Sequence, residues 1–197
     1  MKRIPRSTDR RVLRTRAVLR DALITLVGES GWDAITVQDI CDRAKVGRST
    51  FYTHFADKED LLVSGFDDLR KLIEGLRPPV QRGDVALGFA SPLIEHAYEN
   101  QRLFRALVGK RSGLVAIRRF RELVTGLTEG ELKDVVPGPH LAAVVHYTTG
   151  AFVELVTWWL DSARQLRPDE IDSIFQQLTM RVVTAARGLR ASKRTRG

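Results

Sequence analysis

The chain has 197 residues, of which 43% are hydrophobic and 28% charged, the balance of a globular protein that can bury an ordinary core. The single cysteine, Cys41, excludes an internal disulfide and a cysteine-based zinc site, and we expect a reducing, cytoplasmic location. The basic N-terminus leads into no apolar stretch, so we expect neither a secretory signal nor a membrane anchor there.

The positive charge is concentrated at the two ends of the chain. Residues 1–58 contain 12 Lys and Arg against 7 Asp and Glu, residues 59–190 contain 17 of each, and residues 191–197 contain three basic residues and no acidic one. This distribution fits a protein that binds a polyanion with one end, because Lys and Arg that neutralise phosphates release counterions. Charge alone equally allows a basic protein without an anionic partner.

Apolar residues spaced by three and four predict helices along the first part of the chain. Thr36 followed by Asp39 is typical of a capped helix start, and so is Asp57 followed by Asp60. The prolines in residues 77–79 end the last of these helices. The four helices predicted here cover about residues 19–30, 37–44, 48–55 and 58–76.

The second part of the chain has the same helical spacing. Ser91 followed by Pro92 predicts a helix start, and residues 137–139 (PGP) predict a break. Residues 141–160 are apolar at 14 positions, but Glu154 and His146 disfavour a membrane span and favour a helix buried in protein. The helices predicted here cover about residues 91–98, 103–107, 114–128, 140–161 and 168–189. With no strand pattern and no repeat, the predicted class is all-α.

Residues 36–58 have the form of a helix-turn-helix. Two short helices are separated by a turn of about three residues that contains Gly47. In the second of them, Phe51 and Phe55 are four residues apart and therefore share the face that packs on a core.

The opposite face of that helix carries only side chains that form hydrogen bonds. Arg48 has the reach for a bidentate contact to guanine, Thr50 and Thr53 suit a thymine methyl or a phosphate, and Tyr52 can donate its hydroxyl to a phosphate. Before the first helix lie arginines that would track the minor groove or phosphates, or would form a solvated arm: Arg6, Arg10, Arg11 and Arg14.

Taken together, these segments resemble the head of the tetracycline-repressor (TetR) family of transcription regulators. The resemblance covers about residues 12–62 and is carried by residues 31–40 (GWDAITVQDI) and 44–62 (AKVGRSTFYTHFADKEDLL). Two positions depart from the family pattern. Gly47 replaces a frequent serine or threonine and supplies no capping hydroxyl, and Cys41 replaces a small alanine, which we interpret as core packing.

The resemblance implies a set of DNA-contacting residues. They are Thr36, Arg48, Ser49, Thr50, Tyr52, Thr53, His54 and Lys58. The resemblance implies that Arg48 reads bases, with Ser49, Thr50 and Thr53 beside it. It implies phosphate contacts for Thr36, Tyr52, His54 and Lys58. Outside such a motif, the same side chains have ordinary structural roles as a helix cap, a cover for the core edge or a solvated charge.

The family further implies a homodimer through the last two helices, about 140–161 and 168–189, on a palindromic double-stranded DNA operator. It implies a small-molecule effector, of unknown identity, whose binding in the body opposes DNA binding and releases a repressor. The candidate pocket residues are Phe89, Phe104, Phe120, His146, Tyr147 and Trp158, for which plain core packing is the alternative.

The expected organisation is a DNA-binding head in residues 1–60, a ligand-binding and dimerisation body in residues 61–190 and a basic tail in residues 191–197. We expect a cytoplasmic protein that is associated with the nucleoid when bound to DNA. No GxSxG, complete P-loop or paired histidine spacing occurs, so the sequence predicts no enzyme, no cofactor and no metal site. An alternative is a regulator that uses the same head and dimer without any ligand.

Overall fold

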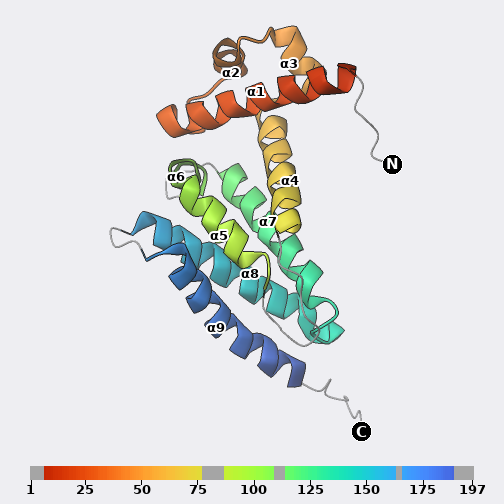
Figure 1. The fold of residues 1–197 in the computed structure, drawn as a ribbon, viewed down its shortest axis with the longest axis vertical. Helices are drawn as coiled ribbons and strands as arrows, with labels where there is room; N and C mark the ends of the chain where they lie inside the picture. Colours follow the sequence, from red (N-terminus) through yellow and green to blue (C-terminus); the bar gives the residue numbers. More distant parts are fainter. Residues whose placement is uncertain (1–6, 77–86, 109–113, 163–165, 189–197) are drawn as a thin grey trace. The chain divides into compact units, whose positions relative to one another are not determined.

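The computed structural model describes residues 7–76, 87–108, 114–162 and 166–188. Within these ranges the regular structure is entirely helical, which confirms the predicted all-α class (Figure 1). The helices are α1 (Ser7–Ser30), α2 (Val37–Ala44), α3 (Arg48–His54), α4 (Lys58–Leu76), α5 (Ala90–Glu99), α6 (Gln101–Val108), α7 (Leu114–Leu132), α8 (Gly138–Asp161) and α9 (Pro168–Gly188).

The chain divides into two compact units. The first comprises Met1–Leu69 and Arg102–Arg119, and the second comprises Arg70–Gln101 and Phe120–Gly197. The predicted head, residues 1–60, falls within the first unit, which also contains α6. The predicted basic tail, 191–197, and most of the predicted loop after α4 lie outside the described residues.

The core of the first unit forms where α1, α2 and α3 meet. The predicted apolar stripe of the first helix, from Leu19 to Val27, is buried, as are Ile40 and Cys41 of α2 and Phe51 of α3, and α2 contacts both of the other helices. The helix itself is longer than the stripe, since it begins at Ser7 rather than near residue 19. Its residues 10–14 are exposed and carry no buried apolar face, so hydrophobic spacing could not locate this part of the helix.

The core of the second unit contains a cluster of aromatic rings. The ring of Phe152 on α8 lies 5.3 Å from that of Phe89, 6.5 Å from that of Phe120 and 5.0 Å from that of Phe175. The contacts with Phe89 and Phe175 are edge-to-face and that with Phe120 is tilted, and together they connect α7, α8, α9 and the residue before α5. The indole Nε1 of the buried Trp159 donates to a backbone carbonyl in the connection between α8 and α9, 2.8 Å away.

The start of α5 differs from the prediction. Ser91 was expected to cap this helix, but the helix begins one residue earlier and Ser91 lies inside it. No side chain caps the helix, and the turn that precedes it is fixed by Glu131 on α7, which accepts hydrogen bonds from the amides of Gly88 at 2.8 Å and Phe89 at 3.1 Å. Glu131 lies in a last turn of α7 that extends past the predicted end at residue 128.

Candidate nucleic-acid interface

The start of α2 is fixed by a capping box, as the sequence predicts. The hydroxyl of Thr36 accepts from the amide of Asp39 at 3.2 Å, and the Asp39 carboxylate accepts from the amide of Thr36 at 2.8 Å. The Thr36 hydroxyl also donates to that carboxylate at 2.6 Å, and this bond first, with the one from the Thr36 amide, holds the pKa of Asp39 below its ordinary value. The arrangement places the exposed Thr36 side chain at the N-terminus of α2, where backbone amides and the helix dipole favour an anion.

The turn between α2 and α3 begins with a residue in the left-handed region. Lys45 has φ 53° and ψ 44°, and its amide donates to carbonyl oxygens of the last turn of α2. Gly47 then caps α3 without any side-chain hydrogen bond, in line with its lack of a hydroxyl. The turn exposes Lys45 and Arg48 on either side of it.

The third helix presents two opposite faces. Phe51 is fully buried, and its ring lies 5.9 Å from that of Phe55. On the outward side, Tyr52 is 50% exposed, and Arg48 is exposed with its guanidinium 5.9 Å from the Tyr52 ring centroid. A hydrogen bond with the Tyr52 side chain is the main cause that raises the pKa of Arg48. Thr53 donates its hydroxyl hydrogen to the carbonyl of Ser49, 2.9 Å away, and so offers an outer surface of methyl and oxygen acceptor.

The structure exposes most of the predicted DNA-contacting residues on two helices that contact each other, α2 and α3. Those that are exposed on α3 or at the start of α2 are Thr36, Arg48, Ser49, Thr50, Tyr52 and Thr53. His54 and Lys58 are half-buried at the end of α3 and the start of α4.

Lys58 has contacts inside the protein that sequence patterns do not reveal. Its ammonium donates to the carbonyl oxygens of Trp32 at 3.0 Å and Ile35 at 2.8 Å, and it lies 4.7 Å from the centroid of the Trp32 ring. An ammonium has three N–H donors, so these two hydrogen bonds leave one for another acceptor. The side chain thus ties the start of α4 to the connection between α1 and α2.

Arg43 is also engaged within the fold. Its guanidinium forms a two-point ion pair with Glu29 on α1, with N to O distances of 3.0 Å and 2.6 Å. The pair fixes the end of α2 on the end of α1. It also removes one positive charge from those available to an external anion.

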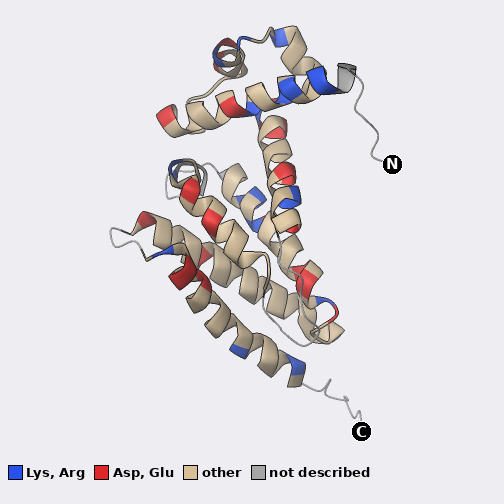
Figure 2. Cartoon of the chain, in the orientation of Figure 1, with Lys and Arg blue, Asp and Glu red and all other residues tan. Residues whose placement is uncertain are grey.

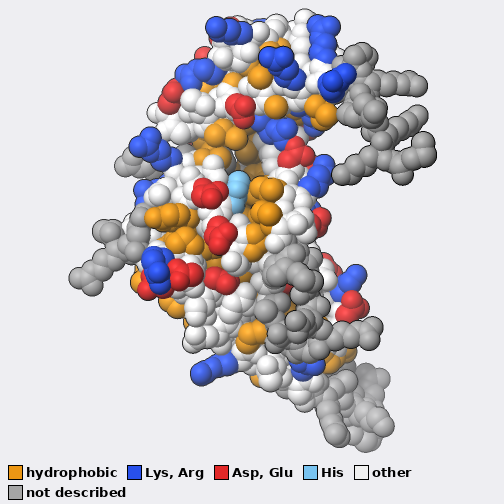
Figure 3. Space-filling view, in the orientation of Figure 1, with side chains coloured by type: hydrophobic (Ala, Val, Ile, Leu, Met, Phe, Trp, Pro, Cys, Tyr) orange, Lys and Arg blue, Asp and Glu red, His pale blue; other side chains and the backbone are white. Residues whose placement is uncertain are grey.

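Other basic residues surround this surface on α1. Arg10, Arg11 and Arg14 are exposed, whereas the guanidinium of Arg16 lies 4.8 Å from the Phe55 ring centroid. Arg6 lies outside the described residues. Lys and Arg mark the N-terminal half of α1, the connection after α2 and the start of α3 (Figure 2), and their side chains are spread over the surface of these helices (Figure 3).

The six predicted pocket residues do not form one lining. Phe89 and Phe120 are fully buried among the rings around Phe152, and Phe104 is buried in the first unit. In contrast, three residues of α8 face solvent, namely His146, Tyr147 and Trp158.

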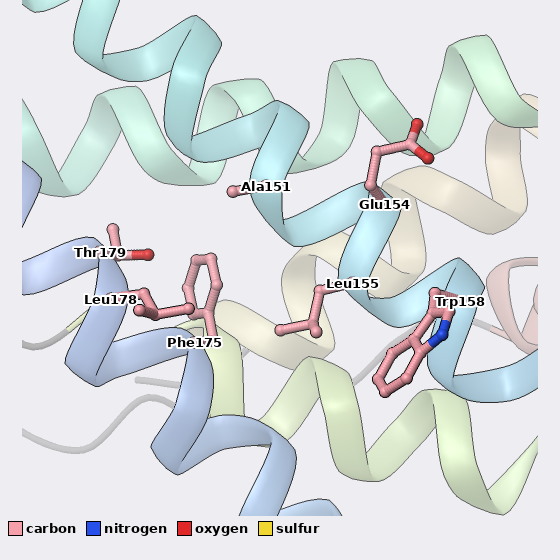
Figure 4. Close-up of a pocket in the computed structure, with 7 residues that line it drawn as sticks. All are labelled: Ala151, Glu154, Leu155, Trp158, Phe175, Leu178 and Thr179. Carbon is pink, nitrogen blue, oxygen red and sulfur yellow. The ribbon is translucent and has the colours of Figure 1, made fainter. Parts of the chain in front are cut away.

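A groove of about 280 Å³ does lie on the second unit, between α8 and α9. Trp158 and Leu155 line it from α8, and Phe175 and Leu178 line it from α9 (Figure 4). Leu178 is 63% exposed and Trp158 57%, so the groove continues into an uncovered apolar surface. Of the predicted pocket residues, it includes Trp158 alone.

Two negative findings apply to the described residues. No group of three or more His, Cys, Asp or Glu side chains in them is placed to hold a metal ion. None of their helices has both the length and the hydropathy needed to cross a membrane.

Sequence reasoning missed several residues that organise these sites. Lys45 could have been noticed as a cation at the end of α2, next to the predicted turn. Glu131 and Gln176 gave no local signal, since each acts on residues more than 40 positions away in the chain.

Comparison with known proteins gives the same assignment for both parts of the chain. The family model of bacterial regulatory proteins of the tetR family matches residues 19–64, and that of a transcriptional regulator C-terminal region matches residues 86–181. An uncharacterized HTH-type transcriptional regulator of Bacillus subtilis (strain 168), YxbF, is 44% identical over 55 residues, which are 27% of this chain and only 14% of that relative.

Solved structures share the fold over nearly the whole chain. A TetR-family regulator from Syntrophomonas wolfei has a TM-score of 0.70 at 19% identity, covering 91% of this chain and 98% of that one. NalD of Pseudomonas aeruginosa, described as the secondary repressor of the MexAB-OprM multidrug efflux pump, has a TM-score of 0.62 at 20% identity, covering 87% and 96%. With its helix-turn-helix head and its helical second unit, this chain belongs to the TetR family of transcriptional regulators.

Proposed function

We propose that the protein is a dimeric, sequence-specific DNA-binding repressor that a small-molecule ligand releases from a palindromic operator. The observation that carries the proposal is the outward face of α3, which is exposed and polar while Phe51 anchors the helix from behind. A helix of seven residues is about 10 Å long and fits a major groove about 12 Å wide. The role of NalD as a repressor supports the direction of control.

Within this proposal, Arg48 reads base edges and the surrounding residues position the helix. Arg48 is suited to guanine O6 and N7, and its packing beside Tyr52 limits the guanidinium's freedom before DNA arrives. Thr36, Tyr52 and His54 bind phosphates, which fix register without reading sequence. Lys58 joins them through the N–H that its internal hydrogen bonds leave over.

The proposed dimer uses the surface around the α8–α9 groove. A two-fold interface needs a self-complementary apolar patch, and the exposed Trp158 and Leu178 beside the groove provide one. Leu178→Glu should raise the dimer dissociation constant by at least about a hundredfold, because association would bury unpaired carboxylates. Leu76→Glu is the matched control, since Leu76 on α4 is 58% exposed and lies off this surface. Sedimentation equilibrium measures both, and an unchanged dimer in Leu178→Glu would reject this interface.

The proposed effector acts on the second unit. Phe89 and Phe120 both contact the Phe152 ring, so a ligand that binds among them must first separate those rings. Such a rearrangement would couple ligand to DNA by favouring a second arrangement of the helices. The proposal places the protein in the cytoplasm, with the nucleoid as its site of action, and assigns it no catalysis and no cofactor.

The test is selection of bound duplexes from a random pool, followed by salt titration of the selected duplex against a scrambled one. The proposal expects a palindromic duplex that is preferred by about a thousandfold or more. Arg48→Ala should remove most of that preference, while Lys133→Ala, which changes an exposed lysine at the end of α7, should leave it intact. Equal, salt-sensitive binding to every duplex would reject sequence-specific regulation.

A further inference from the structure

The positive residues of the helix-turn-helix divide into two groups. Among residues 37–58, Arg43 is held in its ion pair with Glu29, and Lys58 donates twice to backbone carbonyls. Lys45 and Arg48 have no ion pair among the contacts of the described residues, and both are exposed. The nearest acid on the same helix, Asp42, accepts a hydrogen bond from a glutamine side chain at 2.7 Å.

Lys45 also has an unusual backbone. It is the only residue other than glycine with positive φ in the described part of the chain. The equivalent position after α1 is Gly31, with φ 78°, where a side chain is absent and the conformation is unstrained. A lysine in this region is disfavoured relative to glycine by contact of its Cβ with the backbone. A residue kept in a strained conformation suggests a function for its side chain.

We propose that Lys45 binds an operator phosphate, and that its strained conformation is retained because it holds this ammonium beside the start of the recognition helix. The inference rests on the proposed function and adds a contact residue to it. In Figure 2, the connection between α2 and α3 is blue for a basic residue, directly before the basic residue at the start of α3. Lys45 and Arg48 lie at the two ends of one short turn and are both exposed, so the proposal places the Lys45 ammonium on a phosphate that borders the groove Arg48 enters.

A structural alternative makes a different prediction. A cation at the C-terminal end of a helix interacts favourably with its dipole, so Lys45 could act on α2 alone. In that case its removal would change stability and leave the salt dependence of DNA binding unchanged. Charge and backbone can be separated by substitution, since methionine keeps the Cβ and the stem while glycine removes both.

The experiment compares Lys45→Met, Lys45→Arg and Lys45→Gly with the unchanged protein on its selected operator, with Lys133→Met as the control for loss of a distant charge. Lys45→Met should weaken binding to every duplex by similar factors and lower the log-log salt slope by about 0.9 per protomer, or about 1.8 per dimer. Lys45→Arg should keep the slope. Lys45→Gly should lose the slope contribution as Lys45→Met does, and yet raise the folding equilibrium constant about threefold to tenfold.

The outcomes separate the inference from the proposed function. If the unchanged protein selects no operator, both the proposed function and this inference are rejected. If the operator is bound and Arg48→Ala abolishes its preference, an unaltered salt slope in Lys45→Met overturns the inference alone. Weaker DNA binding by Lys45→Met with an unaltered salt slope also overturns the inference, because the effect of the substitution would then be structural. Circular dichroism of each variant verifies that the helices are retained.

Discussion

Replacing Lys58 by methionine tests whether one side chain serves both the fold and the DNA contact. The substitution keeps the length of the stem and removes the ammonium. The carbonyl oxygens of Trp32 and Ile35, at 3.0 Å and 2.8 Å, lose their donor, and the Trp32 ring loses a cation 4.7 Å from its centroid. Both carbonyls lie in the connection that leads to Thr36, so we expect the start of α2 to loosen.

The cost can be worked from these contacts. A hydrogen bond to a charged group contributes about 1.5–3 kcal/mol when it is protected from water. Lys58 is half-buried, so about 1 kcal/mol for each of the two bonds is appropriate, and the contact with the ring adds about 0.5 kcal/mol. The expected loss is about 2–3 kcal/mol of unfolding free energy, which a domain stabilised by about 5–15 kcal/mol survives.

Urea unfolding followed by far-ultraviolet circular dichroism measures this loss, with Lys133→Met as the matched control. A loss below about 0.5 kcal/mol would refute the reasoning, since the two hydrogen bonds would then contribute nothing to the fold. On DNA, the third N–H of Lys58 predicts a salt slope lower by up to about 0.9 per protomer. A stability loss without any change in slope would show that Lys58 acts on the fold alone.

Four further outcomes are expected. Hydrogen bonds from Thr36 hold the pKa of Asp39 below its ordinary value of 3.8. The stability that they contribute is therefore complete above pH 3.8 and is lost as the pH falls through the folded-state pKa. Thr36→Ala should flatten this acid dependence of urea unfolding, and an identical pH profile would contradict the expectation. Gln176→Leu should lower the unfolding free energy by about 1–3 kcal/mol, since it leaves the backbone N–H of Leu87 without its partner and removes one of the two donors to the Leu87 carbonyl, and an unchanged urea midpoint would contradict it. Burial raises the pKa of the Cys41 thiol, so a thiol reagent should label the native protein far more slowly than the urea-unfolded chain, and equal rates would contradict the buried position. Arg43→Gln should reduce stability and leave the salt slope of DNA binding unchanged, because this charge is already neutralised by its ion pair.

The fold could be predicted well where local patterns determine it. The capping box at Thr36 and Asp39 placed α2 correctly, and the hydrogen bond from the Asp60 amide to the Asp57 carboxylate at 2.8 Å matches the predicted cap of α4. Both signals depend on residues three positions apart. Contacts between distant segments lie at the boundary that was wrong, since Glu131 binds the amides of the turn before α5 and the helix begins ahead of Ser91.

The pocket residues could not be predicted for a related reason. Aromatic spacing along one helix indicates a buried or an exposed face only once the neighbouring helices are known. Phe120 and Trp158 are both aromatic residues in helices with apolar spacing, yet Phe120 is fully buried and Trp158 is 57% exposed beside the α8–α9 groove. The hydrophobic pattern therefore predicted a helical body. It did not show which apolar residues lie in its core and which lie on a surface that a second copy of the chain could cover.

The charged residues of the head also could not be sorted from the sequence into those that are paired within the fold and those that are available to DNA. Counting Lys and Arg cannot tell which of them reach solvent without a partner, because partners such as Glu29 and Asp68 come from other helices. In the described part of residues 1–58, side chains engaged inside the fold are Arg16, Arg20, Arg43 and Lys58. Those exposed and in no ion pair within the described residues are Arg10, Arg11, Arg14, Lys45 and Arg48, of which Arg48 is hydrogen-bonded to the Tyr52 side chain. Since a cation paired with a carboxylate has already exchanged its counterion for a protein group, we expect Arg20 and Arg43 to contribute less to the salt dependence of DNA binding than the second set does. The number of Lys and Arg residues in a head of this kind therefore overstates the positive charge that is available to DNA, and its exposed cations outside ion pairs are the candidates for phosphate contacts.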